Sequence, residues 1–241
     1  LNQIPILPDE LTNLNNLRIL HLAGNRFYLL PSLIGDLGSL EELQVSLNAL
    51  EFLPDELTRL TNLKVLDIGF NRIKQVPPNL GILTTLESLN LEFNQISILP
   101  ESIGELNKLK ILNAEYNDLA GVPESIGEIS NLQELILANN LIAQLPATFS
   151  KLSSLTHLDL RKNELSEFPE FINNLMVLQF LDLNSNNIPV IPTWIGNLSF
   201  LEYLAFGDNR VSLIPETIGN LRSLGHLDAS KNDILIIPES I

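Results

Sequence analysis

The sequence predicts an α/β solenoid in which short parallel strands line a concave face and short helices or 3-10 turns cover the convex face. Three regularities of the 241-residue chain carry this prediction. An Asn recurs every 23 residues, a Pro follows each of these Asn residues six positions later, and Leu fills two fixed positions before each Asn from the second onward. Because a fixed period of this length is typical of repeat architectures, one structural unit must recur along the whole chain.

Each repeat opens with the pattern L-x-x-L-x-L-x-x-N, whose nine positions we number from 1 to 9. The apolar residues at positions 4 and 6 alternate with variable residues, which indicates a short strand with one buried face. One strand per repeat has no partner within its own repeat. Successive repeats must therefore stack into a parallel sheet, with strands about 4.8 Å apart.

The Asn at position 9 ends the predicted strand. Its side-chain amide has two N–H donors and an acceptor oxygen, so it can satisfy buried backbone groups of the bend that follows. Stacked from repeat to repeat, these residues form a predicted structural asparagine ladder, which comprises Asn25, Asn48, Asn71, Asn94, Asn117, Asn140, Asn163, Asn186, Asn209 and Asn232.

The second half of the repeat, L-P-x-x-I-G-x-L, predicts the convex side. Pro suits the beginning of a helix, because the N–H that it lacks has no helical partner there. Acidic residues are frequent at the next two positions, where negative charge is favourable at the start of a helix. The Ile, and the Leu three residues later, place apolar side chains on the face that turns to the core.

The two halves together resemble the intracellular 23-residue class of leucine-rich repeats, as found in Ras-group and Ras-scaffold proteins, the Scribble and erbin group, and Roco GTPases. The resemblance covers the whole chain, with Gly replaced by Thr12, Thr58, Ser150 and Asn173. It implies a horseshoe or arc whose concave sheet binds proteins, often small GTPases or phosphatase subunits. The shared motif residues are structural, so the resemblance identifies a fold and no active site.

Residues 1–241 form one predicted domain of about ten 23-residue repeats. The chain starts inside a repeat and stops just after a Pro, and neither end has the polar capping repeat that solenoids generally need. We therefore expect a segment of a longer protein. The alternative is self-association through the open ends of the sheet.

The charge of the chain restricts the class of partner. Its formal net charge is −15, with 29 acidic residues against 14 Lys and Arg. Nucleic acids and anionic membranes need clustered basic residues, so the charge favours a partner protein with a basic surface. No apolar run approaches the roughly 18 residues of a membrane span. The absence of Cys favours a reducing compartment or a bacterial origin, and we expect a cytoplasmic protein.

No motif in the sequence indicates catalysis. Without Cys there is no thiol nucleophile, and the three His residues lie far apart in the sequence. Phosphate-binding Gly-rich patterns and the G-x-S-x-G motif are absent from the sequence. We therefore expect no enzyme activity, no catalytic residue, no metal and no cofactor.

A first candidate binding patch consists of apolar residues at position 8 of four consecutive repeats. They are Leu47, Phe70, Phe93 and Tyr116, and position 7 carries Glu92 and Glu115 in adjacent repeats. An aromatic stripe rimmed by acid is typical of a binding hot spot. The alternative interpretation is half-buried rings that stack along the solenoid as packing.

A second candidate patch combines Asp159 and Asp182 at position 5 of adjacent strands with Asp228 two strands later. Like charges opposite each other in a sheet are destabilising, so the two carboxylates need either a nearby positive charge or a functional role. Arg161 is the residue predicted to supply the positive charge. A solvated charged face and a basic partner surface are both consistent with this pattern, whereas nothing resembles a metal-binding loop. Position 3 of the same region reads His157, Phe180, Tyr203 and His226.

These patches lead to a hypothesis of function. The chain is an interaction scaffold or adaptor that binds a partner protein on its concave face, with small-GTPase signalling as the context that the resemblance implies. One alternative is the recognition arm of a larger enzyme such as a GTPase, cyclase, kinase or ligase. Another is a structural, self-associating bacterial repeat protein.

Overall fold

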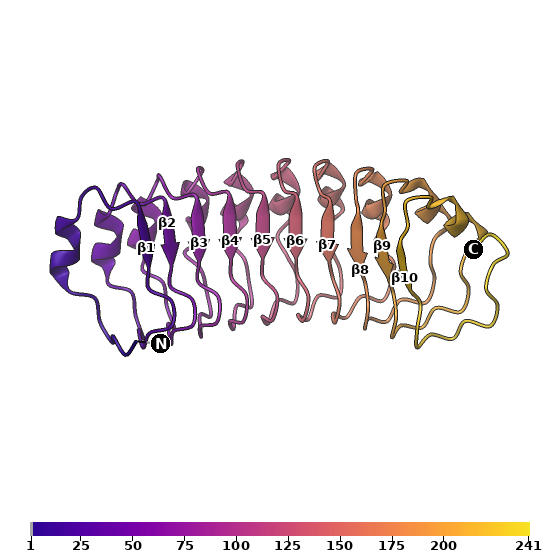
Figure 1. Ribbon diagram of the computed structural model, residues 1–241, viewed down its shortest axis with the longest axis horizontal. Helices are drawn as coiled ribbons and strands as arrows, with labels where there is room; N and C mark the ends of the chain where they lie inside the picture. The colour runs from indigo at the N-terminus through magenta and orange to yellow at the C-terminus, as the bar shows by residue number, and fades with distance from the viewer. Residues whose placement is uncertain (1) are drawn as a thin grey trace.

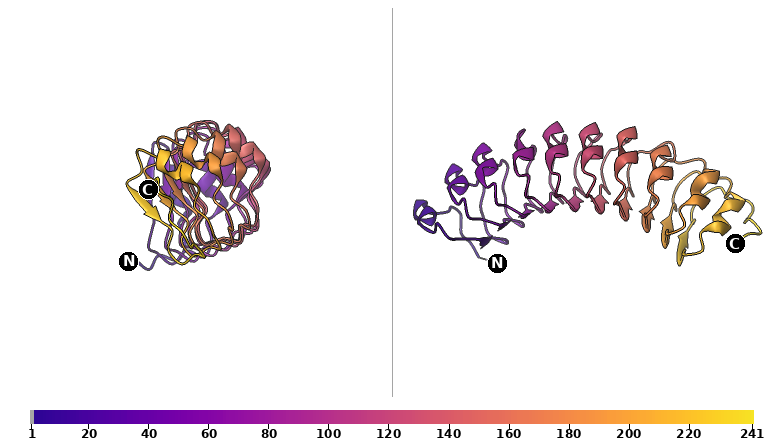
Figure 2. Two further views of the ribbon diagram at one scale, coloured as in Figure 1. Left: turned by 90° about the vertical axis from the view of Figure 1, so that its right-hand side faces the viewer. Right: turned by 90° about the horizontal axis from the view of Figure 1, so that it is seen from above.

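The computed structural model describes residues 2–241 and consists of one ten-stranded parallel sheet bent into an arc (Figure 1). The strands follow one another in sequence order, and the two ends of the chain lie at opposite ends of the arc. Seen from above, the strands line the inner side and the helical turns the outer side (Figure 2). The predicted α/β solenoid with a concave parallel sheet is confirmed.

Each strand covers positions 3 to 5 of the motif, and consecutive strands pair in the same register, so that Leu43 lies opposite Leu66 and Leu66 opposite Leu89. Side chains at one motif position therefore form a row along the arc. The strands are β1 Ile19–His21, β2 Glu42–Gln44, β3 Val65–Asp67, β4 Ser88–Asn90, β5 Ile111–Asn113, β6 Glu134–Ile136, β7 His157–Asp159, β8 Phe180–Asp182, β9 Tyr203–Ala205 and β10 His226–Asp228.

The convex side carries short 3-10 helices, one of the two forms that the sequence left open. A 3-10 helix rises about 2.0 Å per residue against 1.5 Å for an α-helix, so five residues return the chain most of the way across the repeat. The helices are η1 Asp9–Asn13, η2 Ser32–Asp36, η3 Asp55–Arg59, η4 Leu80–Ile82, η5 Glu101–Glu105, η6 Glu124–Glu128, η7 Ala147–Lys151, η8 Glu170–Asn174, η9 Thr193–Asn197 and η10 Glu216–Asn220.

The core is a continuous column of aliphatic side chains between the sheet and the helices. In and beside β6, the Leu residues at motif positions 1, 4 and 6 are completely buried, and so are Ile126 and Ile129 of the preceding helical segment. Burying one such side chain stabilises the fold by about 1.5–3 kcal/mol, so the repeated Leu positions supply most of the favourable free energy.

Asn117 shows how one ladder residue holds three segments of chain together. Its Nδ2 donates to the carbonyl oxygens of Ala114 and Glu115 at 3.2 Å each, and to that of Leu91 in the preceding repeat at 2.9 Å. Its Oδ1 accepts the N–H of Ile96 at 2.9 Å. The amide thus closes the end of its own strand and fastens it to the previous repeat.

The same four bonds recur at every position-9 Asn from Asn48 to Asn232. At the first end, and within residues 2–241, Asn25 donates to the carbonyl of Leu22 alone and accepts the N–H of Ile4. The side chains are most buried in the middle of the arc, where Asn140 is 6% exposed. Buried backbone groups at each bend are satisfied in this way.

Glycine lets neighbouring convex helices approach each other closely. A Cβ on Gly104 would overlap the carbonyl oxygen of Ser125 in the next helix, closer than any real contact allows. Where the repeat has another residue instead, Thr12 and Thr58 donate their hydroxyls to carbonyls of their own helices at 2.9 and 2.7 Å. Of the four helices in which Gly is replaced, η1, η3 and η8 contact the following helix less extensively than the Gly-bearing helices do, whereas η7, with Ser150, contacts η8 closely.

We predict that Asn117→Ala lowers the free energy of unfolding by about 1–3 kcal/mol, because it leaves buried backbone groups unpaired. Asn2→Ala serves as the control, since Asn2 lies at the exposed end of the ladder, and should cost less than about 0.5 kcal/mol. Urea denaturation followed by circular dichroism measures both. Equal losses in the free energy of unfolding at the two positions would contradict the view that burial of the amide determines how much each ladder residue contributes to stability.

A second prediction concerns Gly104→Ala, which should destabilise the protein by about 1–3 kcal/mol, because the new methyl group overpacks the η5–η6 contact. Gly38 is the matched control, since a Cβ there meets nothing within 4 Å. Gly38→Ala should be neutral or stabilising by up to about 1 kcal/mol. Thermal melts of the two variants compare them, and a neutral Gly104→Ala would show that the helices can separate at no cost.

Candidate functional site

The concave surface is strongly acidic. Positions 3, 5 and 7 of the ten strand segments carry one guanidinium, that of Arg161, and eight carboxylates. The acids are Glu42, Asp67, Glu92, Glu115, Glu134, Asp159, Asp182 and Asp228. A sheet face with this charge distribution attracts cationic groups and repels anionic ones.

Position 5 also has a structural role that the sequence analysis missed. At this position an Asp or Asn side-chain oxygen accepts the backbone N–H of the residue two places later, with N···O distances of 2.9 to 3.1 Å, at Asp67, Asn90, Asn113, Asp159, Asp182 and Asp228. Such Asx turns guide the chain out of the strand. The recurrence of Asp and Asn at one motif position was the available signal.

Asp159 and Asp182 are buried side by side. They are register partners in β7 and β8, and they are only 4% and 2% exposed. Burial raises the pKa of the Asp159 carboxyl to about 6, and burial likewise raises the pKa of Asp182 above its ordinary value. The interpretation of these two residues as a solvated charged face is therefore wrong, because neighbouring side chains remove them from water.

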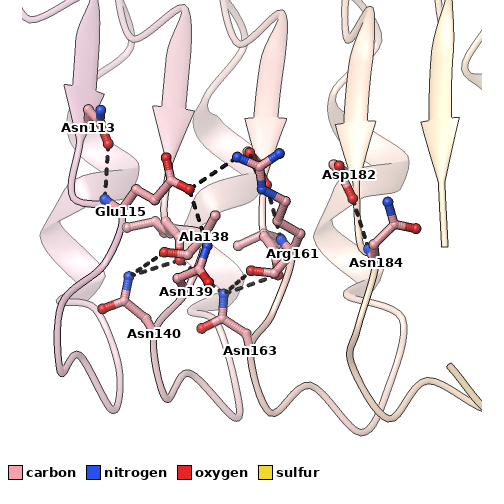
Figure 3. A network of polar contacts seen from close by, with 12 residues as sticks. Asn113, Glu115, Ala138, Asn139, Asn140, Arg161, Asn163, Asp182 and Asn184 are labelled. Atoms are coloured by element: carbon pink, nitrogen blue, oxygen red, sulfur yellow. Dashed lines mark hydrogen bonds and ion pairs between the residues drawn. The ribbon is translucent and has the colours of Figure 1, made fainter. Parts of the chain in front are cut away.

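Arg161 compensates only part of this buried charge. Its Nε lies 3.4 Å from Oδ2 of Asp159, and its Nη2 lies 3.1 Å from Oε1 of Glu115, which comes from two strands away (Figure 3). The predicted compensation of Asp159 by Arg161 is present in the structure. Asp182 accepts a hydrogen bond from the N–H of Asn184 at 2.9 Å, and no cationic side chain within residues 2–241 forms an ion pair with it.

Beside the two Asp residues runs a stack of rings that we call the concave column, made of His157, Phe180, Tyr203 and His226. Successive ring centroids are 3.9, 4.3 and 4.3 Å apart, and the rings are nearly parallel. Since the ring faces cover one another, the column presents mainly ring edges to the concave surface. Burial also lowers the pKa of His157, which favours its neutral form.

The residues of the first patch form an edge row, defined as Leu47, Phe70, Phe93 and Tyr116. Its three rings are stacked with centroid distances of 4.6 and 3.9 Å, and each ring residue remains 37 to 39% exposed. The packing interpretation therefore describes the row, although the rings still reach solvent. Whether they bind a partner stays a prediction.

The backbone of the edge row is left-handed. Position 8 has a positive φ in every repeat from Gly24 onward, with values such as 53° at Phe70 and 48° at Phe93. L-residues with bulky side chains rarely adopt this conformation, which costs roughly 1 kcal/mol or more per residue. The local backbone thus disfavours large apolar residues at this position. Either the stacking of the rings or a role in binding offsets this cost.

Glu92 and Glu115 lie inward of the edge row. Burial, together with the charges of Glu115 and Asp67, raises the pKa of Glu92. Asp228, in contrast, has a pKa below its ordinary value, because the Ser230 hydroxyl and N–H both donate to its carboxylate. Asp228 is separated from the buried Asp pair by Ala205 of β9.

The structure places the predicted residues in two separate groups. The edge row follows the carboxyl ends of β2 to β5, whereas the concave column and the Asp pair lie in β7 to β10. The edge row is at motif position 8, five positions after the concave column and three positions after the Asp pair. The Arg161–Glu115 pair is the link between them.

Within residues 2–241, no cluster of three or more His, Cys, Asp or Glu side chains is arranged to hold a metal ion. Among the helices of the same residues, none has the length and apolar character needed to cross a membrane.

Models of the leucine-rich repeat match three stretches of the chain. The leucine-rich repeat region matches residues 147–235, and two further leucine-rich repeat models match residues 61–119 and 16–37. No curated protein matches the chain in a sequence comparison.

Solved structures of leucine-rich-repeat proteins are similar throughout the chain. A leucine-rich-repeat protein of Leptospira interrogans is 33% identical with a TM-score of 0.95, and the match covers 99% of this chain and 61% of that one. The ectodomain of the Arabidopsis thaliana receptor kinase GASSHO1/SCHENGEN3, in complex with CASPARIAN STRIP INTEGRITY FACTOR 2, is 35% identical with a TM-score of 0.89, covering 97% and 29%. An internalin of Listeria monocytogenes is 27% identical with a TM-score of 0.81, covering 98% and 74%. The chain thus spans less than two thirds of the first two proteins.

We predict that Asp159→Asn stabilises the protein at neutral pH. The folded-state pKa of about 6 lies above the ordinary 3.8, so the wild-type carboxyl stabilises the fold below about pH 4 and this contribution is lost as the pH rises through 6. Asn keeps the acceptor oxygen, as Asn90 and Asn113 do at the same position. The variant should gain roughly 1–3 kcal/mol at pH 7.5 and less than about 0.5 kcal/mol at pH 3.5.

Thermal melts of both proteins across this pH range provide the test. The difference between the two curves reports Asp159 together with its charge interactions with Arg161, Asp182 and Glu115. A wild type that is the more stable protein at pH 7.5 would refute the destabilising role of the buried charge.

Proposed function

We propose that this chain, a leucine-rich-repeat protein, is an interaction domain that holds a partner protein or peptide with a basic surface against its concave sheet. The observation that carries the proposal is the charge of that face, with its eight carboxylates and the single guanidinium of Arg161. Electrostatic complementarity of this kind speeds association and excludes acidic partners.

The shape of the face supports the same proposal. Ten strands spaced about 4.8 Å apart give a surface roughly 43 Å long, enough for the ~800 Å² per partner of a standard interface. Leucine-rich repeats commonly mediate protein–protein interaction and are typically non-enzymatic binding modules. The GASSHO1/SCHENGEN3 ectodomain, which has the same fold, is in complex with CASPARIAN STRIP INTEGRITY FACTOR 2.

The finer parts of the proposal rest on the resemblance of the repeat and on the absence of Cys. We place the protein in the cytoplasm, as a scaffold or adaptor whose partner is a small GTPase or a phosphatase subunit. A recognition arm within a larger enzyme uses the same face, so both versions make the same prediction for the experiment below. A self-associating repeat protein instead predicts that the chain captures chiefly copies of itself.

The test is affinity capture from a lysate with three baits, followed by mass spectrometry. The first bait is the wild type, the second carries Glu92→Lys with Glu134→Lys on the concave face, and the third carries Glu101→Lys with Glu124→Lys on the exposed convex helices. Both variants change the net charge equally. We expect basic proteins that the first and third baits retain and the second loses by about tenfold or more.

The outcomes are distinct. Equal loss in both variants would mean nonspecific attraction by total charge, and no loss in the concave variant would remove the concave face from the function. Melting temperatures of the three baits show that each is folded. Capture is repeated at two salt concentrations, because a charge-steered complex weakens as salt rises.

A further inference from the structure

We infer that Asp159 and Asp182, with the neighbouring Phe180, form a subsite that receives one cationic side chain, Lys or Arg, of the bound partner. The inference rests on the proposed function and specifies which of the concave acids make the direct contact. It follows from three properties of the two carboxylates. The fold does not use their charge, the charge is only partly paired within the described chain, and the unpaired oxygen of Asp182 is not fully enclosed.

The negative charge is not needed by the fold. Asp159 and Asp182 accept the N–H two residues on at 3.1 and 2.9 Å. In β4 and β5 the same position is Asn90 and Asn113, whose neutral amide oxygens accept the equivalent N–H at 3.1 and 3.0 Å. A neutral amide oxygen thus accepts this N–H as well as a carboxylate does, and β6 and β9 form the same turn with Ile136 and Ala205 at this position, so the turn makes no use of the negative charge. The repeat itself provides this comparison, with identical backbone and register.

The charge is also unfavourable in the free protein. Two carboxylates in directly opposite positions of adjacent strands repel each other, and both lose most of their contact with water. Arg161 pairs with Asp159 and Glu115, whereas Oδ2 of Asp182 receives no hydrogen bond or ion pair from residues 2–241. A cation from outside the chain relieves both the repulsion and the unpaired oxygen.

The unpaired oxygen keeps a small accessible area, although Asp182 as a whole is only 2% exposed. In the described chain, Ser125 Oγ is the single fully enclosed side-chain atom without a partner, so Oδ2 of Asp182 is not fully enclosed. The next strand carries Ala205 opposite Asp182, so no longer side chain from that strand competes for the oxygen. Two residues before Asp182 in the same strand, the edge of the Phe180 ring provides an apolar surface for the methylene stem of a Lys or Arg.

A bound metal ion does not fit this subsite, because the described residues bring no third carboxylate or imidazole into ligand geometry. The stacked neighbours His157 and Tyr203 cover both faces of the Phe180 ring, so an approaching cation meets the ring edge. Recognition consequently depends on the carboxylates, which can accept charge-assisted hydrogen bonds from an ammonium or a guanidinium.

The experiment uses three synthetic peptides of twelve residues, in which Ser alternates with Arg, with Lys or with citrulline, the neutral isostere of Arg. Each is titrated by fluorescence anisotropy at low salt against the wild type, Asp182→Asn, and the double variant Asp159→Asn with Asp182→Asn. The matched control is Glu101→Gln with Glu124→Gln, which removes two charges from the convex side.

We expect the Arg or the Lys peptide to bind the double Asn variant about tenfold more weakly than the wild type, and the control within about twofold. The citrulline peptide should not bind. The two cationic peptides show which head group the subsite prefers. The double variant should melt at a higher temperature than the wild type at pH 7.5, so that weaker binding does not come from unfolding.

Two results overturn the subsite. One is binding of both cationic peptides to the double Asn variant within twofold of the wild type, and the other is equal binding of the citrulline peptide. The proposed function is judged separately by the Glu92→Lys, Glu134→Lys bait. If that bait loses its partners while the Asn variants bind normally, the concave face binds the partner and the subsite is wrong. If that bait keeps them, the proposed function is wrong.

Discussion

The hydrogen bonds of the asparagine ladder set the register on which every other feature of the molecule depends. Each amide ties the end of its strand to a carbonyl 26 residues earlier and to an N–H 21 residues earlier, as Asn117 does with Leu91 and Ile96. Because these bonds recur unchanged, motif positions align exactly one above another, and rows of like residues appear along the arc. The ring stacks, the acidic face and the opposed Asp pair are all consequences of this alignment.

The same alignment explains how far the sequence could predict the structure. A period of 23 residues was sufficient for the strands, their parallel order, the ladder and the rows in which Phe93, Asp159 and Phe180 lie. The sequence could not show that Asp159 and Asp182 are withdrawn from water, because their burial depends on side chains of neighbouring rows. It also missed the left-handed backbone of position 8, since aromatic residues there give no local sign of a positive φ.

Position 5 combines a structural role with a chemical one. An oxygen at this position shapes the end of the strand in β3 to β5 and again in β7 and β8, whether the residue is Asp67, Asn90 or Asp182. The choice between amide and carboxylate is then free to set the charge of the concave surface. The fold tolerates either group, but burial makes the carboxylate the less stable choice. A loss of folding stability that is retained in this way is typical of a functional site.

The uneven occurrence of glycine on the convex side has a mechanical consequence. Backbone hydrogen bonds hold the inner spacing of the strands constant, whereas the outer spacing depends on whether neighbouring helices touch closely. The convex helices are therefore least tightly packed on one another at η1–η2, η3–η4 and η8–η9. A change in the spacing of these helices would leave the hydrogen bonds of the sheet in place. The last of the three pairs, η8 and η9, lies on either side of β8 in the sequence, the strand that carries Asp182.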